Sequence, residues 1–357
     1  MEVTSEENFN VHIDEALSEK SLPPKAAPRK YEISKRTVLA LFYWHVAGLY
    51  GLYLVFTSAK WQTILFTLLL YMAANIGMTA GAHRLWSHKA YKAKIPLQLI
   101  LIVFFSLTFH YTAIDWVRNH RVHHKYTDTD ADPHNSTRGF FFSHIGWVMV
   151  KKHPEVLKKG KTFDFSDIYN DPILRFQRKY AIPFIGSICF VIPTLIPMYF
   201  WGESLRNAWH IAAVLRFIAG IHSGALINSA AHMYGNKPYD KNIKASQNML
   251  VSFVTLGEGF HNYHHVFPYD YKAAELGNNR WNLTTLFIDI FAWIGWAYDL
   301  KTVPASSVSS RSKRTGDGTD LWGEIRNEGE ADKTNRGWGP QLTALTCMVY
   351  LHFYCDV

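Results

Sequence analysis

The sequence predicts an all-α integral membrane protein, with four transmembrane helices and a helical, histidine-rich cap on the cytoplasmic side. Three observations predict this fold class. Four apolar stretches are each long enough to cross a bilayer. The pattern His-x-x-His-His occurs twice, at residues 120–124 and 261–265. All the histidine clusters fall on one side of the membrane that the four stretches define.

The four stretches occupy residues 37–58, 61–82, 181–201 and 208–228. A helix needs about 20 apolar residues to cross the hydrocarbon layer, and each stretch meets that length. Buried helices of a large soluble core are the alternative. Four near-uniform stretches, joined in two pairs by short links, favour membrane spans instead. An apolar content of 48% with only 18% charged residues agrees with that choice.

A fifth apolar run, residues 95–109, lies between HRLWSH (83–88) and HRVHH (120–124). If these two motifs act together, the chain between them crosses the membrane twice or not at all. A single run of this length cannot cross twice, so we expect it to lie on the membrane surface or dip into it. Two spans separate His124 from His232 and none separates His232 from His261. The histidine clusters therefore share one face.

The distribution of basic residues orients the chain, since cytoplasmic loops are enriched in lysine and arginine. The link between the first two spans contains only Lys60, and Arg206 in the other link is offset by Glu203. Both termini and the histidine clusters are therefore predicted to be cytoplasmic. The segment before the first span carries five basic residues: Lys25, Arg29, Lys30, Lys35 and Arg36.

The regions outside the spans carry weaker signals. Residues 1–36 are polar, with no apolar signal segment, and are predicted to form a cytoplasmic tail. The stretch 283–299 is predicted to pack against the cap or lie at the interface. Residues 321–357 are predicted to form a divergent, flexible tail. Despite a net charge of +8, no basic stripe or nucleic-acid motif is present, so we expect no nucleic-acid partner. The three cysteines form no disulfide framework.

The histidines predict a metal site. His-x-x-His-His places ligands at i, i+3 and i+4, on one face of a helix. His83 and His88 are five residues apart, which is about 140° on a continuous α-helix, so they either flank a helix end or serve two metals. With His232, nine candidates exceed the three or four ligands of a zinc site and suit two metals. The nine candidates are His83, His88, His120, His123, His124, His232, His261, His264 and His265.

Two redox metals at a membrane face indicate dioxygen chemistry on an apolar substrate, because no amino acid can oxidise an unactivated C–H bond. Acidic residues beside the histidines are further candidates to orient the imidazoles, although as surface acids they would need no such role. These acidic residues are Asp128, Asp130, Asp132 and Glu258.

Five segments resemble the membrane acyl-CoA desaturases, the stearoyl-CoA desaturase family, and in particular its insect branch. They are GAHRLWSH (81–88), DWVRNHRVHHKYTDTDADPHN (115–135), RGFFFSHIGW (138–147), NSAAHMYGNKPYDK (228–241) and GEGFHNYHHVFPYDYK (257–272). The resemblance runs from residue 37 to residue 320. It is more specific than the histidine patterns alone, which other desaturases and hydroxylases share.

The resemblance implies a di-iron site with the nine histidines as ligands and Asn228 reaching one iron through a water. It implies a fatty acyl-CoA substrate, O2 as co-substrate, and cytochrome b5 with its reductase as electron donors. It also implies a multi-pass protein of the endoplasmic reticulum membrane. The product would be an acyl-CoA with a new double bond in its chain.

The resemblance also implies substrate contacts. Arg118, Lys151 and Lys152 would bind the CoA phosphates, although the basic run at 151–161 also fits a lipid-facing patch. Trp116 would line the acyl tunnel. The sequence departs from the family at several positions: Asn119 replaces Asp, His110 replaces Gln, and Gly224-Ala225 replaces Thr-Trp. These departures leave the chain length and the position and geometry of the double bond open. The other departures are at Thr37 and Phe260.

Two other functions remain as alternatives. A membrane di-iron lipid hydroxylase would share the oxidant and yield an oxygenated product. A metal transporter would need polar residues inside the spans, and these contain no acidic residue. The polar and basic residues that the spans do contain include His45, Asn75, Arg216 and His222.

Overall fold

The computed structural model describes residues 31–275, 282–322 and 324. The chain divides into two compact units, residues 1–33 and 34–357, and the elements described below belong to the second. The predictions for residues 1–30 and for the tail after residue 324 lie outside the described residues. The described part is mostly helical, as predicted, with one two-stranded sheet in which β1 (Lys92–Ala93) pairs antiparallel with β2 (Ala297–Tyr298).

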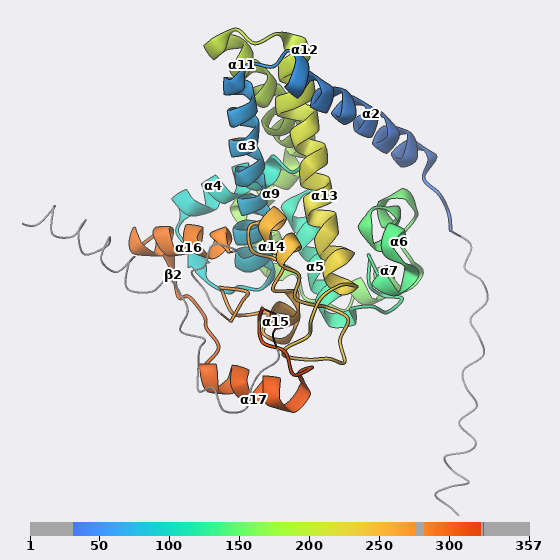
Figure 1. Cartoon of the computed structure of the whole chain (residues 1–357), viewed down its shortest axis with the longest axis vertical. Helices are drawn as coiled ribbons and strands as arrows, with labels where there is room; N and C mark the ends of the chain where they lie inside the picture. The colour runs from blue at the N-terminus through green and yellow to red at the C-terminus, as the bar shows by residue number, and fades with distance from the viewer. Residues whose placement is uncertain (1–30, 276–281, 323, 325–357) are drawn as a thin grey trace, which may run out of the picture. The chain divides into compact units, whose positions relative to one another are not determined.

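Among the described residues, four helices are long and apolar enough to cross a membrane: Lys35–Thr57, Trp61–Ser87, Ala181–Trp201 and Leu205–His232. They confirm the four predicted spans (Figure 1). Their outward faces carry large apolar side chains, such as Leu39 and Phe42, which are 68% and 69% exposed. In water such a surface would be costly, and in a bilayer it meets lipid tails. The second and fourth helices continue past their predicted ends and carry His83 and His232.

Each span consists of one or more consecutive helical segments. The first span is α2 (Lys35–Thr57), and the second joins α3 (Trp61–Ile76) to the π-helix η1 (Gly77–Ser87). The third joins α10 (Ala181–Gly186), η4 (Ser187–Val191) and α11 (Ile192–Trp201). The fourth joins α12 (Leu205–Asn207), η5 (Ala208–Leu215), α13 (Arg216–Asn228) and η6 (Ala230–His232).

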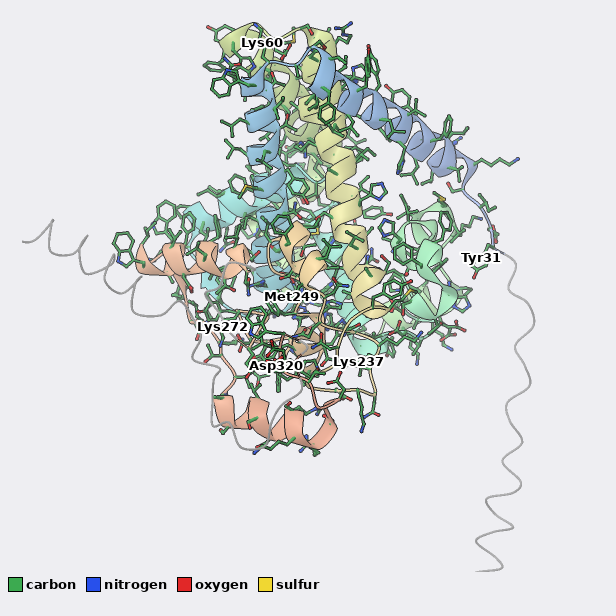
Figure 2. All side chains as sticks on the ribbon, viewed as in Figure 1. Tyr31, Lys60, Lys237, Met249, Lys272 and Asp320 are labelled. Carbon is green, nitrogen blue, oxygen red and sulfur yellow. The ribbon has the colours of Figure 1, made fainter. Side chains whose placement is uncertain are left out.

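The two links between paired spans are bonded to each other, at the end of the spans where Figure 2 labels Lys60. The backbone N–H of Lys60 donates to Glu203 at 2.9 Å, and the Thr63 hydroxyl donates to the same carboxylate oxygen at 2.7 Å. The Lys60 ammonium donates to the carbonyls of Trp201 and Gly202. These charge-assisted bonds hold the ends of the two helical hairpins together.

The fifth apolar run forms α4 (Ile95–Ser106), whose 12 residues span about 18 Å, too short to cross a bilayer about 30 Å thick. It packs closely on the second span where that span passes Gly77. A Cβ at Gly77 would lie 2.1 Å from the backbone nitrogen of Phe105. Glycine is required at this crossing because any side chain would separate the two helices.

The remaining elements form the cap that carries most of the histidines. Its helices are α5 (Ala113–Tyr126), η2 (Ser136–Arg138), α6 (Phe140–His144), η3 (Gly146–Met149), α7 (Pro154–Gly160), α8 (Ser166–Asn170), α9 (Pro172–Lys179), α14 (Met249–Thr255), α15 (His261–Val266), α16 (Leu283–Trp293) and α17 (Ala305–Thr315). In the stretch predicted to pack on the cap or at the interface, α16 buries Ile288 in the main core and leaves Trp293 82% exposed.

Candidate metal centre

All nine predicted histidines converge into two groups whose ligand atoms lie within 4.8 Å of one another. The five-histidine group contains His83, His88, His120, His124 and His264. The four-histidine group contains His123, His232, His261 and His265. The sequence predicted these nine histidines, and the fold divides them into two groups.

The Nε2 atoms within each group are close enough to share a cation. In the five-histidine group, His264 Nε2 lies 2.9 Å from His83 Nε2 and 3.0 Å from His124 Nε2. In the four-histidine group, His261 Nε2 lies 3.0 Å from both His232 Nε2 and His265 Nε2. One Nε2 carries at most one proton, so hydrogen bonds alone do not explain three converging nitrogens. Two nitrogens each about 2.1 Å from one metal, at a right angle, are about 3.0 Å apart. The donor set therefore fits two metal ions.

Each His-x-x-His-His motif contributes to both groups. On α5, His120 and His124 join the five-histidine group and His123 joins the other. On α15, His264 joins the five-histidine group, and His261 and His265 join the four-histidine group. The prediction of one shared helix face was too simple, because residues i+3 and i+4 point to either side of the line through residue i. This division holds the two sites side by side.

His83 and His88 lie in one group although an α-helix would separate them. The segment Gly77–Ser87 is π-helical, and the His88 N–H donates to the His83 carbonyl at 3.2 Å, an i to i+5 bond. This wider winding brings residues five apart nearly above one another. His88 caps the end of the helix, so the helix-end alternative from the sequence is the observed one.

Carboxylates lie beside the Nδ1 atoms of three of the imidazoles. Glu258 lies 2.8 Å from His83, Asp132 lies 3.0 Å from His123, and Asp128 lies 3.4 Å from His232. A carboxylate on the second nitrogen fixes the ring orientation and makes the ligating nitrogen a stronger donor. Asp130, a fourth candidate, instead lies at the surface, 3.4 Å from Arg138.

Burial keeps the ligands neutral. It lowers the pKa of His88, His120 and His124 well below the ordinary value, and neighbouring imidazoles lower it further. The same holds for His264 and His265. Neutral imidazole is the form that binds metals. Burial alone would raise the pKa of Glu258, but His83 and the guanidinium of Arg84 outweigh it and lower the pKa to about 2.

Arg121 joins the two elements that supply the five-histidine group. Its guanidinium donates from α5 to the carbonyls of Trp86 and Ser87 at the end of η1. It also makes two bonds to Asp167 of α8, at 2.9 and 2.6 Å. Arg121 follows His120 directly, so these bonds fix the helix turn that presents His120 and His124. In the sequence, this role has no signal beyond an arginine beside a histidine.

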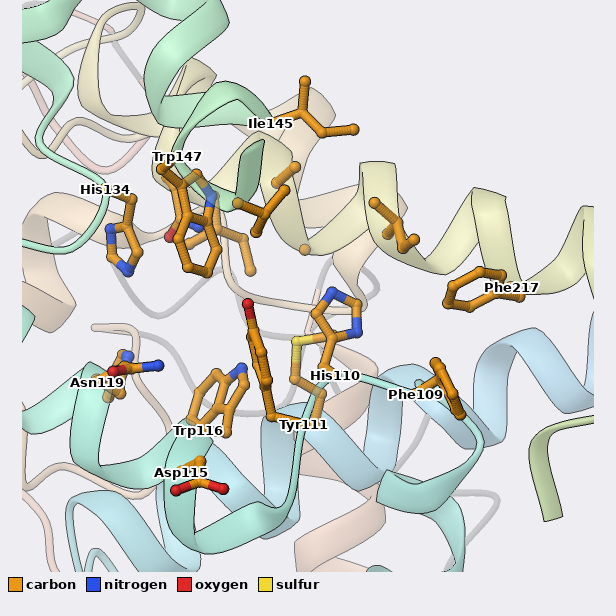
Figure 3. A pocket seen from close by; sticks show the side chains of 18 of the residues that line it. Phe109, His110, Tyr111, Asp115, Trp116, Asn119, His134, Ile145, Trp147 and Phe217 are labelled. Carbon is orange, nitrogen blue, oxygen red and sulfur yellow. The ribbon is translucent and has the colours of Figure 1, made fainter. Parts of the chain in front are cut away.

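A cavity of about 530 Å³ reaches the metal centre, and His83, His120 and His261 form part of its wall. In Figure 3, Asn119 and His134 lie toward one side of the cavity, and Phe109 and Phe217 toward the other. The cavity therefore passes from a polar side to an apolar side. Trp116 lines it and stacks on His120 at 4.8 Å, next to the metal ligands.

The predicted tunnel residues His110, Gly224, Ala225 and Asn119 all line this cavity, and so does Asn228. Phe109 and Tyr111, on either side of His110, have φ of 54° and 61°, a conformation that non-glycine residues rarely adopt. Burial lowers the pKa of His110 to about 4, so its ring is neutral. A Cβ at Gly224 would lie 3.2 Å from Met78 Cε and 3.8 Å from His110 Nε2.

The three predicted CoA contacts lie outside the described wall of the cavity. The guanidinium of Arg118 lies over the rings of Phe165 and Tyr169, at 5.3 and 5.9 Å. The Lys152 ammonium donates to Asn119 Oδ1 at 2.6 Å, so this basic residue adjoins the polar side of the cavity. Lys151 precedes it on the same exposed segment.

Sequence reasoning missed two histidine features. His134 is buried, lines the cavity, and has its Nδ1 3.4 Å from Asp132. A separate three-histidine chain joins α2, α13 and α6. His45 Nε2 lies 3.1 Å from His222 Nε2, and His222 Nδ1 lies 3.0 Å from His144 Nε2. His222 uses a different nitrogen for each neighbour, so the three rings cannot bind one ion together. This three-histidine chain joins helices next to the cavity wall. Its members are isolated in the sequence, so no motif indicated that they would meet.

Comparison of the sequence with known proteins identifies the family of this chain. The sequence profile of the family described as fatty acid desaturase matches residues 59–287. An acyl-CoA Delta(11) desaturase of Spodoptera littoralis is 65% identical over 85% of this chain and 89% of its own length. The (11Z)-hexadec-11-enoyl-CoA conjugase of Bombyx mori is 61% identical over 86% of this chain and 92% of its own length. Stearoyl-CoA desaturase 5 of Homo sapiens is 49% identical over 82% of this chain and 88% of its own length.

The family match includes all nine histidines and neither of the flanking tails. The sequence identities hold over most of each chain. The histidine groups, the apolar cavity and the four long apolar helices agree with the family match. This chain belongs to the fatty acid desaturase family.

Proposed function

We propose that this protein is an acyl-CoA desaturase, which uses O2 and two electrons to introduce a double bond into a fatty acyl-CoA chain. One observation carries the proposal: an apolar cavity has three of the nine clustered histidines in its wall. The names of the similar proteins support it and favour it over a lipid hydroxylase.

The proposed role of each residue follows from its position. The two histidine groups would each hold an iron ion, with Asn228 completing the four-histidine site through a water. When bound, the two irons supply the activation of O2 that no side chain can provide. Two hydrogens leave adjacent carbons of the acyl chain, and with two further protons and two electrons O2 becomes two waters.

The cavity would position the acyl chain and exclude water. Trp116, stacked on His120, is next to the ligands and would fix the carbons that react. His110, Gly224 and Ala225 would shape the path of the chain beyond that point. The CoA head would remain on the polar side, near Asn119 and Lys152, with Arg118 and Lys151 as further contacts for its phosphates.

The basic residues before the first span support a cytoplasmic placement of both termini and of the metal centre. We infer that the protein resides in the endoplasmic reticulum membrane. There, cytochrome b5 and its reductase would deliver the electrons. A separate donor is needed because the mechanism uses two electrons that the acyl chain does not provide.

The test is expression in yeast that lacks its own desaturase, with double-bond positions read by mass spectrometry of disulfide adducts. A new monounsaturated acid is expected, and a His124→Ala variant should abolish it. The position of the double bond in the new acid would report the geometry of the cavity. Oxygenated acids in place of alkenes would support the hydroxylase instead. Protein that accumulates with its metals but forms no alkene from any chain length would contradict the proposal.

A further inference from the structure

The carboxylates beside the five-histidine group are each paired with a guanidinium, Glu258 with Arg84 and Asp167 with Arg121. The carboxylate in contact with the group is Glu258, which lies 2.8 Å from His83 Nδ1. The same carboxylate binds Arg84 through Nη2 at 2.8 Å and Nε at 3.2 Å, and both side chains are almost fully buried. The negative charge of Glu258 is therefore offset by the positive charge of Arg84.

The four-histidine group has two carboxylates and no such compensation. Asp132 lies 3.0 Å from His123 Nδ1, and Asp128 lies 3.4 Å from His232 Nδ1. Asp132 otherwise accepts the backbone N–H groups of Asp128 and His134 and lies near the neutral His134 ring. Asp128 accepts from the backbone and hydroxyl of Ser136. Among the described residues, no lysine or arginine forms an ion pair with either carboxylate.

The two halves of the centre are therefore electrically unequal. Neutral imidazoles add donor atoms but no charge, so the difference comes from the carboxylates behind them. Within a buried site, such charges are weakly screened. Two uncompensated negative charges stabilise the more positive state of a nearby metal ion, and a cancelled pair has little net effect. The four-histidine group should favour the higher oxidation state.

We propose that Asp128 and Asp132 make the four-histidine group the half that binds its metal more tightly and stays ferric longer, so that the first electron goes to the five-histidine group. The proposal rests on the proposed function, because it takes the two metals to be iron. Asp128 and Asp132 act through His232 and His123, and are positioning residues. In each step, one electron from an external donor converts one ferric ion to ferrous.

The first experiment uses the full-length protein loaded with 57Fe and titrated with a reductant, with Mössbauer spectra taken along the titration. Wild-type protein should reduce in two separate steps, with one ferric and one ferrous ion at the midpoint. Asp128→Asn should bring the two steps closer, because it raises the potential of the later one. Glu258→Gln leaves Arg84 uncompensated, so it should raise the potential of the earlier step and separate the two steps further.

Asp128→Asn is suited to this test because residue 128 has φ of 59°, which asparagine tolerates well. Asp130→Asn is the matched control: the same change in the same loop, at an exposed carboxylate that pairs with Arg138. It should leave both steps unchanged. The wild-type titration needs no variant, so a variant that fails to fold does not end the test.

A second measurement does not depend on iron. Zinc-loaded protein challenged with a chelator should release its metal in two phases, the slow phase from the four-histidine group. Loss of an outer carboxylate typically weakens metal binding about 10- to 100-fold, so Asp128→Asn should accelerate only the slow phase by about that factor.

Two results would overturn the proposal: a single reduction step for both irons in the wild type, or an Asp128→Asn variant that alters the earlier step or the fast phase. These results are separate from the yeast test. Unequal irons without any alkene product would contradict the proposed function and leave this inference standing. Alkene formation with equivalent irons would do the reverse.

Discussion

At the scale of single residues, the space around Gly224 decides how much room the cavity offers. A Cβ there meets the flexible end of Met78 at 3.2 Å and the ring of His110 at 3.8 Å. Both neighbours line the same cavity as the metal ligands. The identity of one residue can therefore alter which acyl chains fit, with every ligand retained.

Replacing Gly224 with Ala and then Leu should progressively shift the products toward shorter acyl chains, because each added carbon takes volume from the cavity. Chromatography of the total fatty acids from yeast that expresses each variant would measure the shift. Gly220→Ala is the control, since Gly220 lies one turn earlier on α13 and outside the cavity wall. An unchanged chain-length profile in Gly224→Leu would show that acyl chains do not pass this residue.

At the scale of elements, the centre depends on contacts that join helices distant in the sequence. Arg121 connects the end of η1 to α5 and, through Asp167, to α8. The three-histidine chain connects α2 to α13 and α6. The first set of contacts fixes ligands, and the second fixes a wall of the cavity.

Asp167→Asn should destabilise the protein in a pH-dependent way. Burial raises the pKa of Asp167, but bonds to Arg121 and Lys89 outweigh this and lower it to about 2. A lowered carboxylate pKa stabilises the fold above the unfolded value of about 3.9 and loses its effect as pH falls toward 2. The variant should therefore unfold with about 1 kcal/mol less stability from pH 5 to 8.

Thermal unfolding of the detergent-solubilised protein at a series of pH values would test this expectation. The difference between variant and wild type should stay constant from pH 8 to 5 and shrink below pH 4. A difference that grows on acidification would have the wrong sign for this ion pair. Asp130→Asn again provides the matched exposed change.

His222→Phe should loosen α2 from α13. The substitution keeps a ring but removes both nitrogens, which leaves His45 and His144 without these partners. A fully buried polar group that loses its partner costs about 1–3 kcal/mol, and His45 and His144 are half-buried, so each should cost less than that. Hydrogen exchange should therefore rise in α2. His210→Phe, on the same span but outside the three-histidine chain, retains a ring next to Tyr50 of α2 and should leave the exchange of α2 unchanged. Equal exchange in wild type and His222→Phe would show that apolar packing alone holds α2.

At the scale of the whole compact unit, the metal centre connects the span ends to the cap. The second span and its C-terminal cap bring His83 and His88 to it, the fourth span brings His232, and α5 and α15 bring the other six histidines. Bonds between the two links at the opposite ends of the spans hold the hairpins together there. The cap therefore depends on metal binding more than the spans do.

Removing the metals should lower the thermal stability of the protein and expose the cap before the spans. A ligand present at 1,000 times its dissociation constant contributes about 4 kcal/mol, and apo-protein loses that contribution. Limited proteolysis after chelation should cut near α5 and α15 first, and metal addition should restore protection. Cleavage within the links near Lys60 and Glu203, with the cap intact, would contradict this order.

The four spans and the convergence of nine histidines follow from the sequence alone, because a bilayer demands long apolar helices and a metal site demands a high density of histidine. The sequence could not assign each histidine to a metal. That depended on a π-helical turn at Gly77–Ser87 and on the angle at which α5 meets α15, and both arise from packing. Which carboxylate contacts which imidazole depends on the fold. Asp128, Asp130 and Asp132 are equivalent in the sequence, and the fold turns two of them inward and leaves one at the surface.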